Sequence, residues 1–91
     1  MPALEPLDLA HLPTPLEPAR NLGRRLGIPL LFKRDDCTGL ATGGNKARKL
    51  AWIVADALRA EADTLVTFGG IQSNHARMTA AAAARSGLGC T

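Results

Sequence analysis

Two Gly-Gly pairs constrain this chain most, because each separates a short apolar run from a helical pattern. The first pair is residues 43–44 and the second is residues 69–70. Glycine pairs interrupt strands, and short apolar runs that alternate with longer helical patterns are typical of right-handed crossover units in a parallel sheet. We expect strands at residues 28–33, 63–68 and 89–91, and helices at residues 45–60 and 73–85. The predicted fold class is therefore α/β.

The N-terminal part of the chain has a different character. Five of the six prolines lie in residues 1–18, which favours an extended segment because proline fixes φ and removes an N–H donor. A short helix is expected over residues 17–26, with Pro18 in its first turn and Gly27 as its stop. The strand at residues 28–33 is expected to be buried, because it is an apolar run bounded by turn residues.

The length of 91 residues suits one small domain or part of a larger fold. A parallel sheet needs both faces covered, and this sequence holds at most two full strands and the start of a third. We therefore expect a partial parallel three-layer sandwich. Residues 1–44 would form the extended N-terminal segment, the short helix and the first strand, and residues 45–91 would begin a truncated α/β domain.

Charge and composition exclude some classes of function. Hydrophobic residues make up 46% of the chain, so the composition is not that of a disordered protein. The net charge is +3, but the basic clusters have no interleaved aromatic residues, so nucleic-acid binding is not expected. A small anion such as phosphate suits the cluster at residues 46–49 better.

The cysteines and the termini bear on location. Cys37 and Cys90 show neither CxxC spacing nor histidines at metal-ligand spacing, so we expect no metal site and reduced thiols packed as small apolar groups. The N-terminus lacks a signal-peptide pattern, and no apolar run reaches membrane-spanning length. We therefore expect a cytoplasmic protein with no membrane partner.

Lys46 stands where the helix after the first Gly-Gly pair begins. The apolar stripe of that helix is expected at Leu50, Ile53, Val54, Ala57 and Leu58, and Lys46 lies one turn before it on the same face. An inward amine in a low dielectric, at the positive end of the helix dipole, favours the free base that attacks carbonyls. The alternative from this stretch alone is a lysine that extends along the helix to water.

A second polar group stands at the start of the next helix. Parallel sheets bind ligands beyond the carboxyl ends of their strands, so Ser73, Asn74 and His75 should meet Lys46 at one edge. Each has a simpler role as well: Ser73 and Asn74 suit the helix N-cap, and His75 suits the surface or the packing. Arg77 is expected to be solvated or salt-bridged. Adjacent Asp35 and Asp36 should point to opposite faces, which disfavours a shared acid–base role.

Three stretches together carry a resemblance to a known family. They are residues 33–40, KRDDCTGL; residues 43–50, GGNKARKL; and residues 69–77, GGIQSNHAR. They resemble the pyridoxal-phosphate enzymes of the D-cysteine desulfhydrase and 1-aminocyclopropane-1-carboxylate deaminase family, in the tryptophan synthase β-subunit fold group. The resemblance covers nearly the whole chain but only the N-terminal part of a family member, and full-length members are usually homodimers.

The resemblance implies a role for each polar residue. Lys46 would form the Schiff base with pyridoxal phosphate and later move protons at the substrate α-carbon. Asn74 would hydrogen-bond the phenolic oxygen of the cofactor, and Lys49 would approach the phosphate. Ser73 and His75, together with backbone amides of residues 72–75 that include Asn74, would hold the carboxylate of a small amino-acid substrate. Ser73 would also take part in proton transfer. Residues 45–91 would then begin the cofactor-side domain.

The choice of substrate depends on one position. Residues 73–75 of this chain are Ser-Asn-His, whereas deaminases that open the cyclopropane ring typically resemble Ser-Asn-Gln at these positions. The histidine therefore favours elimination from D-cysteine to sulfide, pyruvate and ammonia. The alternatives are 1-aminocyclopropane-1-carboxylate deaminase, L-cysteate sulfo-lyase and a non-catalytic α/β fragment. The family's later glycine-rich phosphate loop and active-site tyrosines have no counterpart in this sequence, so the isolated chain is expected to have little or no turnover.

Overall fold

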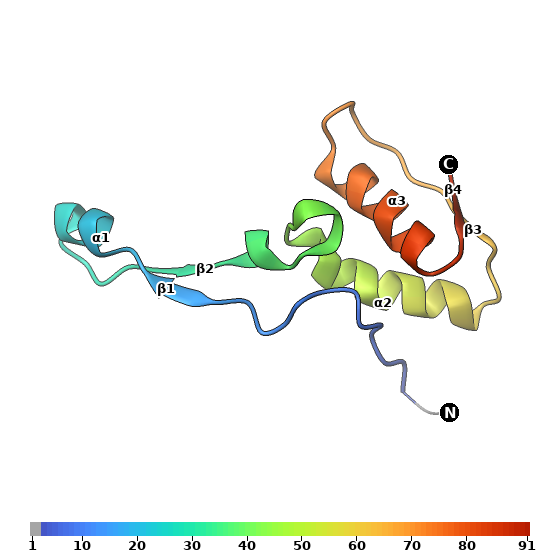
Figure 1. Ribbon diagram of the computed structural model, residues 1–91, viewed down its shortest axis with the longest axis horizontal. Coiled ribbons are helices and arrows are strands. Elements are labelled where there is room, and N and C mark those ends of the chain that lie inside the picture. The colour runs from blue at the N-terminus through green and yellow to red at the C-terminus, as the bar shows by residue number, and fades with distance from the viewer. Residues whose placement is uncertain (1–2) are drawn as a thin grey trace.

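The structure, a computed structural model, describes residues 3–91 and has a mixed α/β fold (Figure 1). It measures 51 × 36 × 16 Å along its principal axes, so it is long and flat. The elements in chain order are β1 (Leu16–Pro18), α1 (Arg20–Leu26), β2 (Leu31–Lys33), η1 (Asp35–Cys37), η2 (Leu40–Thr42), α2 (Lys46–Arg59), β3 (Thr64–Leu65), α3 (Asn74–Arg85) and β4 (Gly89–Cys90), where η marks a 3₁₀ helix.

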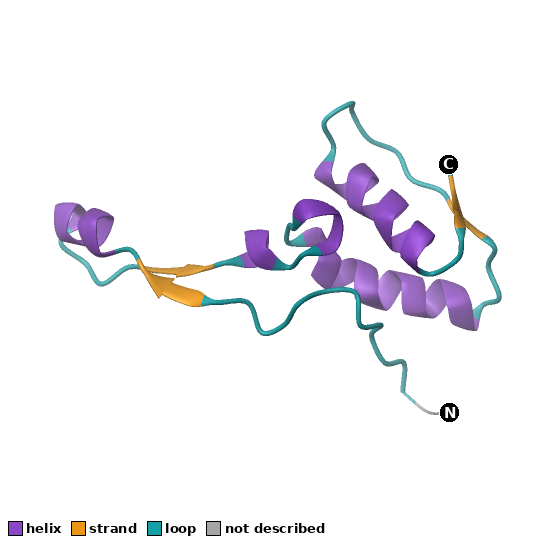
Figure 2. Cartoon of the chain, viewed as in Figure 1, coloured by secondary structure: helices purple, strands orange, loops and turns teal. Residues whose placement is uncertain are grey.

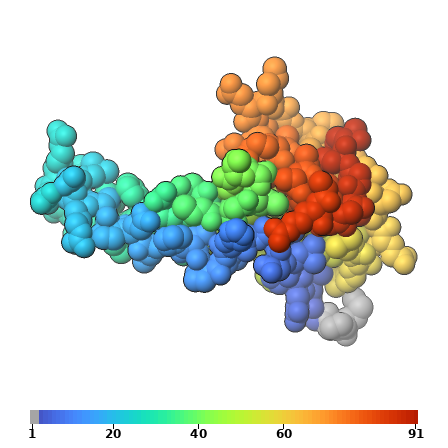
Figure 3. Space-filling view, in the orientation of Figure 1, coloured from blue at the N-terminus to red at the C-terminus, as the bar shows by residue number. Residues whose placement is uncertain are grey.

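The elements β1, α1 and β2, which we call the arm (residues 16–33), project from the rest of the molecule (Figures 1 and 3). β1 pairs antiparallel with β2, and Leu16 lies opposite Lys33. The arm ends at α1, where Gly27 takes a left-handed conformation with φ 71° and its N–H donates to the carbonyl of Arg24. The predicted stop of this helix at Gly27 is therefore confirmed.

Two predictions for the arm are wrong. The strand at residues 28–33 is shorter, exposed, and paired with β1 instead of joining a parallel sheet. The proline-rich segment supplies this partner, because it is extended and lies alongside. The helix begins at Arg20 and not at residue 17, since the backbone up to Pro18 is already held in β1.

The core lies between α2 and α3 (Figure 2). Alanines of both helices are buried here. The buried apolar cluster consists of Leu9, Leu40, Ala47, Leu50, Ala51, Val54, Leu65, Met78, Ala82 and Ala83. The predicted stripe on α2 is partly wrong, because Ile53 and Leu58 are exposed. The observed stripe is rotated toward the alanines, where α3 can approach closely.

The unit β3–α3–β4 is the one predicted crossover that the structure contains within residues 3–91. β3 and β4 are parallel, with Thr64 opposite Gly89, so the predicted strand at residues 89–91 is confirmed. Both strands have only two residues, so the strand predicted at residues 63–68 is shorter than expected, and Val66 lies outside it and is 65% exposed. Because the sheet is this narrow, most of its residues stay exposed. α3 ends as predicted, with Gly87 at φ 74° and Leu88 N–H bonded to the Ala83 carbonyl.

Three other predictions concern the cysteines, the membrane and the division of the chain. The thiols Cys37 and Cys90 are free but exposed, so the prediction that they pack as small apolar groups is wrong. Across residues 3–91, none of the helices has the length and apolar character needed to cross a membrane. The division at residues 44 and 45 stays a prediction, although Leu9 and Leu40 from the first part pack in the same core as α2.

Candidate active site

Lys46 is the first residue of α2 and is partly buried. Its neighbour Ala47 is fully buried and fixes this end of the helix against the core. Asn45 occupies the N-cap position without a side-chain capping bond, so the first N–H groups of α2 have no side-chain acceptor from that residue. Lys49, one turn further along, is exposed. The amines of both lysines therefore belong to the N-terminal end of α2, as predicted.

A loop of residues 38–44 delivers the chain into α2. Thr38 is fully buried, and its hydroxyl accepts a hydrogen bond from the Gly44 N–H at 2.9 Å and donates one to the Gly44 carbonyl at 2.7 Å. Gly43 has φ 96°, and a Cβ there would lie 1.9 Å from the Asp36 carbonyl oxygen. Close backbone approach thus requires glycine at position 43, and the Thr38 side chain holds the loop at Gly44.

The same loop is held from the other side by Arg77 of α3. Its guanidinium donates to the Ala41 carbonyl, to the Thr42 hydroxyl at 3.2 Å and to the Gly43 carbonyl at 3.3 Å. Arg77 is exposed, in line with the expected solvated side chain, and none of the ion pairs within residues 3–91 involves it. Its contacts with this loop have no signal in the sequence. Ala41 and Thr42 have φ of 49° and 69°, a left-handed conformation that costs about 1–3 kcal/mol for such residues unless the surroundings enforce it.

The start of α3 carries the second predicted group. Ser73 is the N-cap, and its hydroxyl accepts a hydrogen bond from the Ala76 N–H at 3.1 Å, which confirms the capping role. Asn74 is exposed at the first helical position. His75 is partly buried, and its Nδ1 atom is buried without a hydrogen-bond partner among residues 3–91. A buried polar atom without a partner is costly, so this imidazole is suited to a ligand.

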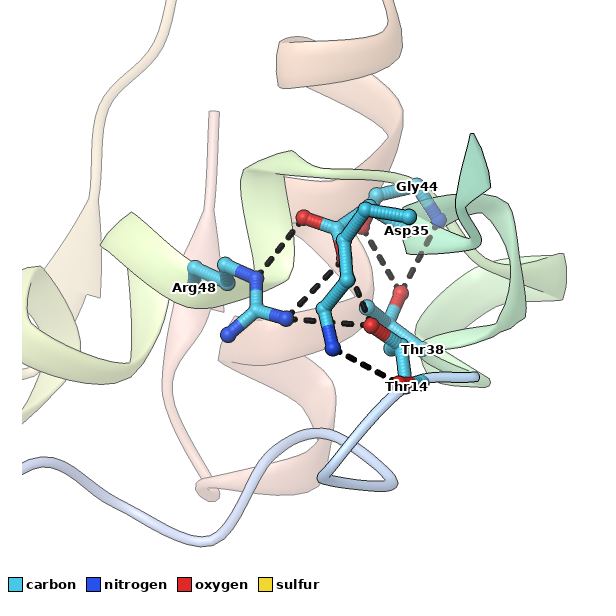
Figure 4. Close-up of polar contacts among 6 residues, drawn as sticks. Thr14, Asp35, Thr38, Gly44 and Arg48 are labelled. Atoms are coloured by element: carbon cyan, nitrogen blue, oxygen red, sulfur yellow. Dashed lines mark hydrogen bonds and ion pairs between the residues drawn. The ribbon is translucent and has the colours of Figure 1, made fainter. Parts of the chain in front are cut away.

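Sequence reasoning missed a polar cluster at the first turn of α2, around Arg48 (Figure 4). The Asp35 carboxylate accepts hydrogen bonds from Arg48 Nε at 2.7 Å, from Arg48 Nη2 at 2.9 Å and from the Thr14 hydroxyl at 2.8 Å. These donors lower the pKa of Asp35 from 3.8 to about 2, Arg48 first and Thr14 second, and the same pairing raises the pKa of Arg48. The cluster joins the N-terminal segment, η1 and α2. Its members are 34 positions apart, and spacing alone gave no signal for it.

Asp36 differs from its neighbour as expected. Its carboxylate pairs with Arg34, with an ion-pair distance of 2.8 Å, and this hydrogen bond lowers the pKa of Asp36. Arg34 also pairs with Glu17 at 2.7 Å. The two adjacent carboxylates thus pair with different arginines, although they lie in the 3₁₀ helix η1 and not in a strand.

The structure joins the two predicted groups through the loop and not through a direct contact. Arg77, one turn after Ser73, bonds the loop that ends at Lys46. In the described part of the chain, no hydrogen bond links Lys46 to Ser73, Asn74 or His75. Neither α2 nor α3 has an acidic residue in its first turn, so both positive helix ends can face an anion. Such an arrangement suits an anionic ligand that reacts with an amine.

Comparisons with known proteins agree with this chemistry. The family model described as pyridoxal-phosphate dependent enzyme matches residues 7–91. The D-cysteine desulfhydrases of Klebsiella pneumoniae (strain 342) and Salmonella newport (strain SL254) are 58% identical over 84 residues, which cover 92% of this chain and 26% of theirs. The crystal structure of an ACC deaminase homologue matches with a TM-score of 0.90 and 42% identity, over 93% of this chain and 26% of that one. The chain therefore spans about a quarter of the length of these relatives.

Proposed function

The chain belongs to the family of pyridoxal-phosphate-dependent enzymes, and from this membership we propose that it provides the lysine-bearing part of a D-cysteine desulfhydrase. The observation that carries the proposal is the position of Lys46. It begins α2, partly buried, on a loop that α3 holds directly. The substrate in this proposal is a small amino acid, and the location is the cytoplasm.

The residues present fit this cofactor. Within residues 3–91, Lys46 makes no ion pair with a carboxylate, so its amine is available for a carbonyl. The buried Nδ1 atom of His75 can be satisfied by a bound group. The starts of α2 and α3 carry no acidic side chain that would repel a phosphate or a carboxylate.

Each residue has a role in this proposal. When bound, pyridoxal phosphate supplies an aldehyde and a ring that withdraws electrons from the substrate α-carbon. Lys46 gives its amine to the covalent link and then moves the proton at that carbon. Asn74 donates to the phenolic oxygen, while Lys49 binds the phosphate. Ser73 and His75 hold the substrate carboxylate, and Ser73 assists proton transfer.

D-cysteine is our first choice of substrate, with release of sulfide, pyruvate and ammonia. The support is the 58% identity to proteins named D-cysteine desulfhydrase, against 42% to the ACC deaminase homologue. The histidine at position 75 points the same way. 1-Aminocyclopropane-1-carboxylate and L-cysteate are the alternative substrates, and both belong in the same assay.

A chimera tests the proposal. Residues 1–91 replace the matching segment of the Klebsiella pneumoniae desulfhydrase, and release of ammonia, the product common to the three reactions, is measured with D-cysteine, L-cysteate and 1-aminocyclopropane-1-carboxylate. Sulfide is measured in addition with D-cysteine. We expect D-cysteine to be preferred. Lys46→Ala should lower the rate by about a thousandfold or more, whereas Lys49→Ala, the matched lysine one turn away, should mainly weaken cofactor binding. A folded chimera that keeps its activity after Lys46→Ala contradicts the assignment.

The chain by itself is expected to behave differently. We expect no measurable sulfide from the 91-residue chain with pyridoxal phosphate and D-cysteine, because the matched relatives are about four times as long. Robust sulfide release would contradict this expectation. The competing function, a non-catalytic α/β module, predicts in addition that the folded chain forms no adduct with pyridoxal phosphate.

A further inference from the structure

Arg77 connects the two parts of the candidate site with one side chain. It lies one turn after Ser73 in α3, and its three hydrogen bonds reach consecutive residues of the loop before α2. The loop ends at Gly44, two residues before Lys46. A contact through Arg77 therefore links the helix that begins after Ser73 to the loop that leads into Lys46.

The loop needs such a contact because its backbone is strained. Ala41 and Thr42 are consecutive left-handed residues without glycine's freedom, and a β-branched residue in that conformation is uncommon. Arg77 donates to both of these residues. Thr38 holds the opposite end, with both hydrogen bonds to Gly44. Together the two side chains fix a loop conformation that local sequence disfavours.

The contrast with Arg85 shows that this is specific to Arg77. Both arginines belong to α3 and both are exposed at the residue level. Arg85 makes one hydrogen bond in the described residues, to the Leu9 carbonyl at 3.3 Å, at the far end of the helix. The planar guanidinium of Arg77 donates to three acceptors in one loop. A lysine ammonium does not have this fixed, forked arrangement of donors.

We propose that Arg77 and Thr38 are positioning residues for Lys46, which hold the loop of residues 41–44 and so set where the first turn of α2 lies relative to the start of α3. The inference rests on the proposed function, since it assigns a purpose to the placement of Lys46. Neither side chain needs to touch the cofactor or the substrate. Both act through the backbone of the loop.

The first measurement needs no cofactor. Hydrogen exchange of the amides of residues 41–46 is followed in the 91-residue chain and in Arg77→Met, Arg77→Lys and Thr38→Val. Loss of a charged hydrogen bond should speed exchange in this segment by about tenfold in Arg77→Met. The exchange rate in Arg77→Lys should lie between those of the unsubstituted chain and Arg77→Met. Thr38→Val should also speed exchange, and Thr38→Ser, which keeps the hydroxyl, should return the rate to that of the unsubstituted chain. Arg85→Met is the matched control and should leave residues 41–46 unchanged.

The second measurement reports the amine directly. The lysine amine condenses with the aldehyde of pyridoxal phosphate with loss of water, and borohydride reduces the C=N bond to a stable secondary amine. Peptide mass spectrometry then gives the share of label on Lys33, Lys46 and Lys49. We expect Lys46 to carry most of the label in the unsubstituted chain and in Arg85→Met. In Arg77→Met and Thr38→Val its share should fall by about threefold or more.

Each combination of the exchange result and the labelling result either supports or overturns the proposal. Faster exchange together with a reduced Lys46 share supports the proposal. Unchanged exchange in Arg77→Met, or a loop that is unprotected in the parent chain, overturns it. Faster exchange with an unchanged Lys46 share shows a structural contact only and also overturns it. Label spread evenly over the lysines in the parent chain instead refutes Lys46 as the reactive amine, and the exchange result still reports on the loop separately.

Discussion

The arm and the α2–α3 core use the same residue types in opposite ways. Leu31 and Phe32 of the arm are 57% and 48% exposed, whereas Leu50 and Met78 of the core are 1% and 0% exposed. The arm owes its shape to backbone pairing between β1 and β2 and to the left-handed end of α1. The core owes its shape to burial. Local backbone rules can therefore shape a segment that has no hydrophobic core of its own.

The two regions meet at Asp35. Its carboxylate holds Arg48 of α2, and Thr14 just before the arm donates to the same group. Lys33 at the end of β2 adds a hydrogen bond to the Thr14 carbonyl at 2.7 Å. These contacts between Thr14, Lys33, Asp35 and Arg48, which we call the joint, are polar and partly exposed, unlike those of the core.

A matched pair of leucine substitutions should show the largest difference. Leu50→Ala removes a fully buried side chain from the α2–α3 contact, so we expect a loss of about 2–5 kcal/mol in the free energy of unfolding. Leu31→Ala in the arm should change it by no more than about 0.5 kcal/mol. Urea titration followed by circular dichroism measures both. Equal losses would mean that the arm is as tightly packed as the core.

A matched pair of glycine substitutions comes next. Gly43→Ala places a Cβ 1.9 Å from a backbone oxygen at φ 96°, so we expect a loss of about 3 kcal/mol. Gly27→Ala in the arm meets nothing within 4 Å, and only its positive φ counts against it, at about 1 kcal/mol. The same titration gives both values. A Gly43→Ala chain as stable as Gly27→Ala would contradict the loop geometry.

The helix caps offer a smaller effect. α3 has a side-chain cap at Ser73, whereas α1 begins at Ala19 without one. Ser73→Ala should cost about 1 kcal/mol, and Ser73→Asn should restore that stability because asparagine also caps. In the desulfhydrase chimera, Ser73→Asn should still lose activity if the hydroxyl moves a proton. Activity that recovers together with stability would leave capping as the whole role of Ser73.

The smallest effect concerns pH at the joint. The pKa of Asp35 is lowered from 3.8 to about 2, so its contribution to stability is complete above about pH 4 and is lost as the pH falls through 2. Thermal unfolding between pH 4 and pH 2 should therefore show a decline in stability. In Asp35→Asn the decline should be shallower. An identical pH dependence in the two proteins would show that the ion pair with Arg48 does not matter in solution.

Some features of the fold could be predicted because their causes are local. Gly27 and Gly87 end helices since left-handed backbone suits glycine, and Ser73 caps α3 since its hydroxyl reaches an N–H three residues ahead. Strand pairing could not be predicted in the same way. Residues 31–33 could join a parallel sheet or pair with the proline segment, and only the tertiary arrangement selects β1. The exposure of Ile53 likewise depends on how α3 is placed.

The candidate site likewise has features that follow from local sequence and features that depend on tertiary contacts. The placement of Lys46 and Ser73 at two helix starts follows from the glycine pairs, and their roles remain proposals that the experiments above can test. The contacts of Arg77 and Asp35 had no sequence signal, because they join residues 34 to 36 and 13 positions apart. A side chain can choose among many acceptors at such separations. Only the folded chain shows which one it takes.

The sequence by itself determined where α1 and α3 end, where α2 and α3 begin and which amine stands at the start of α2, because caps and glycines act over a few residues. It also carried the motifs by which the family is identified. The tertiary structure alone decided that the arm stands free, that α3 covers the alanine side of α2, and that Arg77 holds the loop before Lys46. These features depend on contacts between distant segments, and their geometry is set by packing and not by local backbone preference.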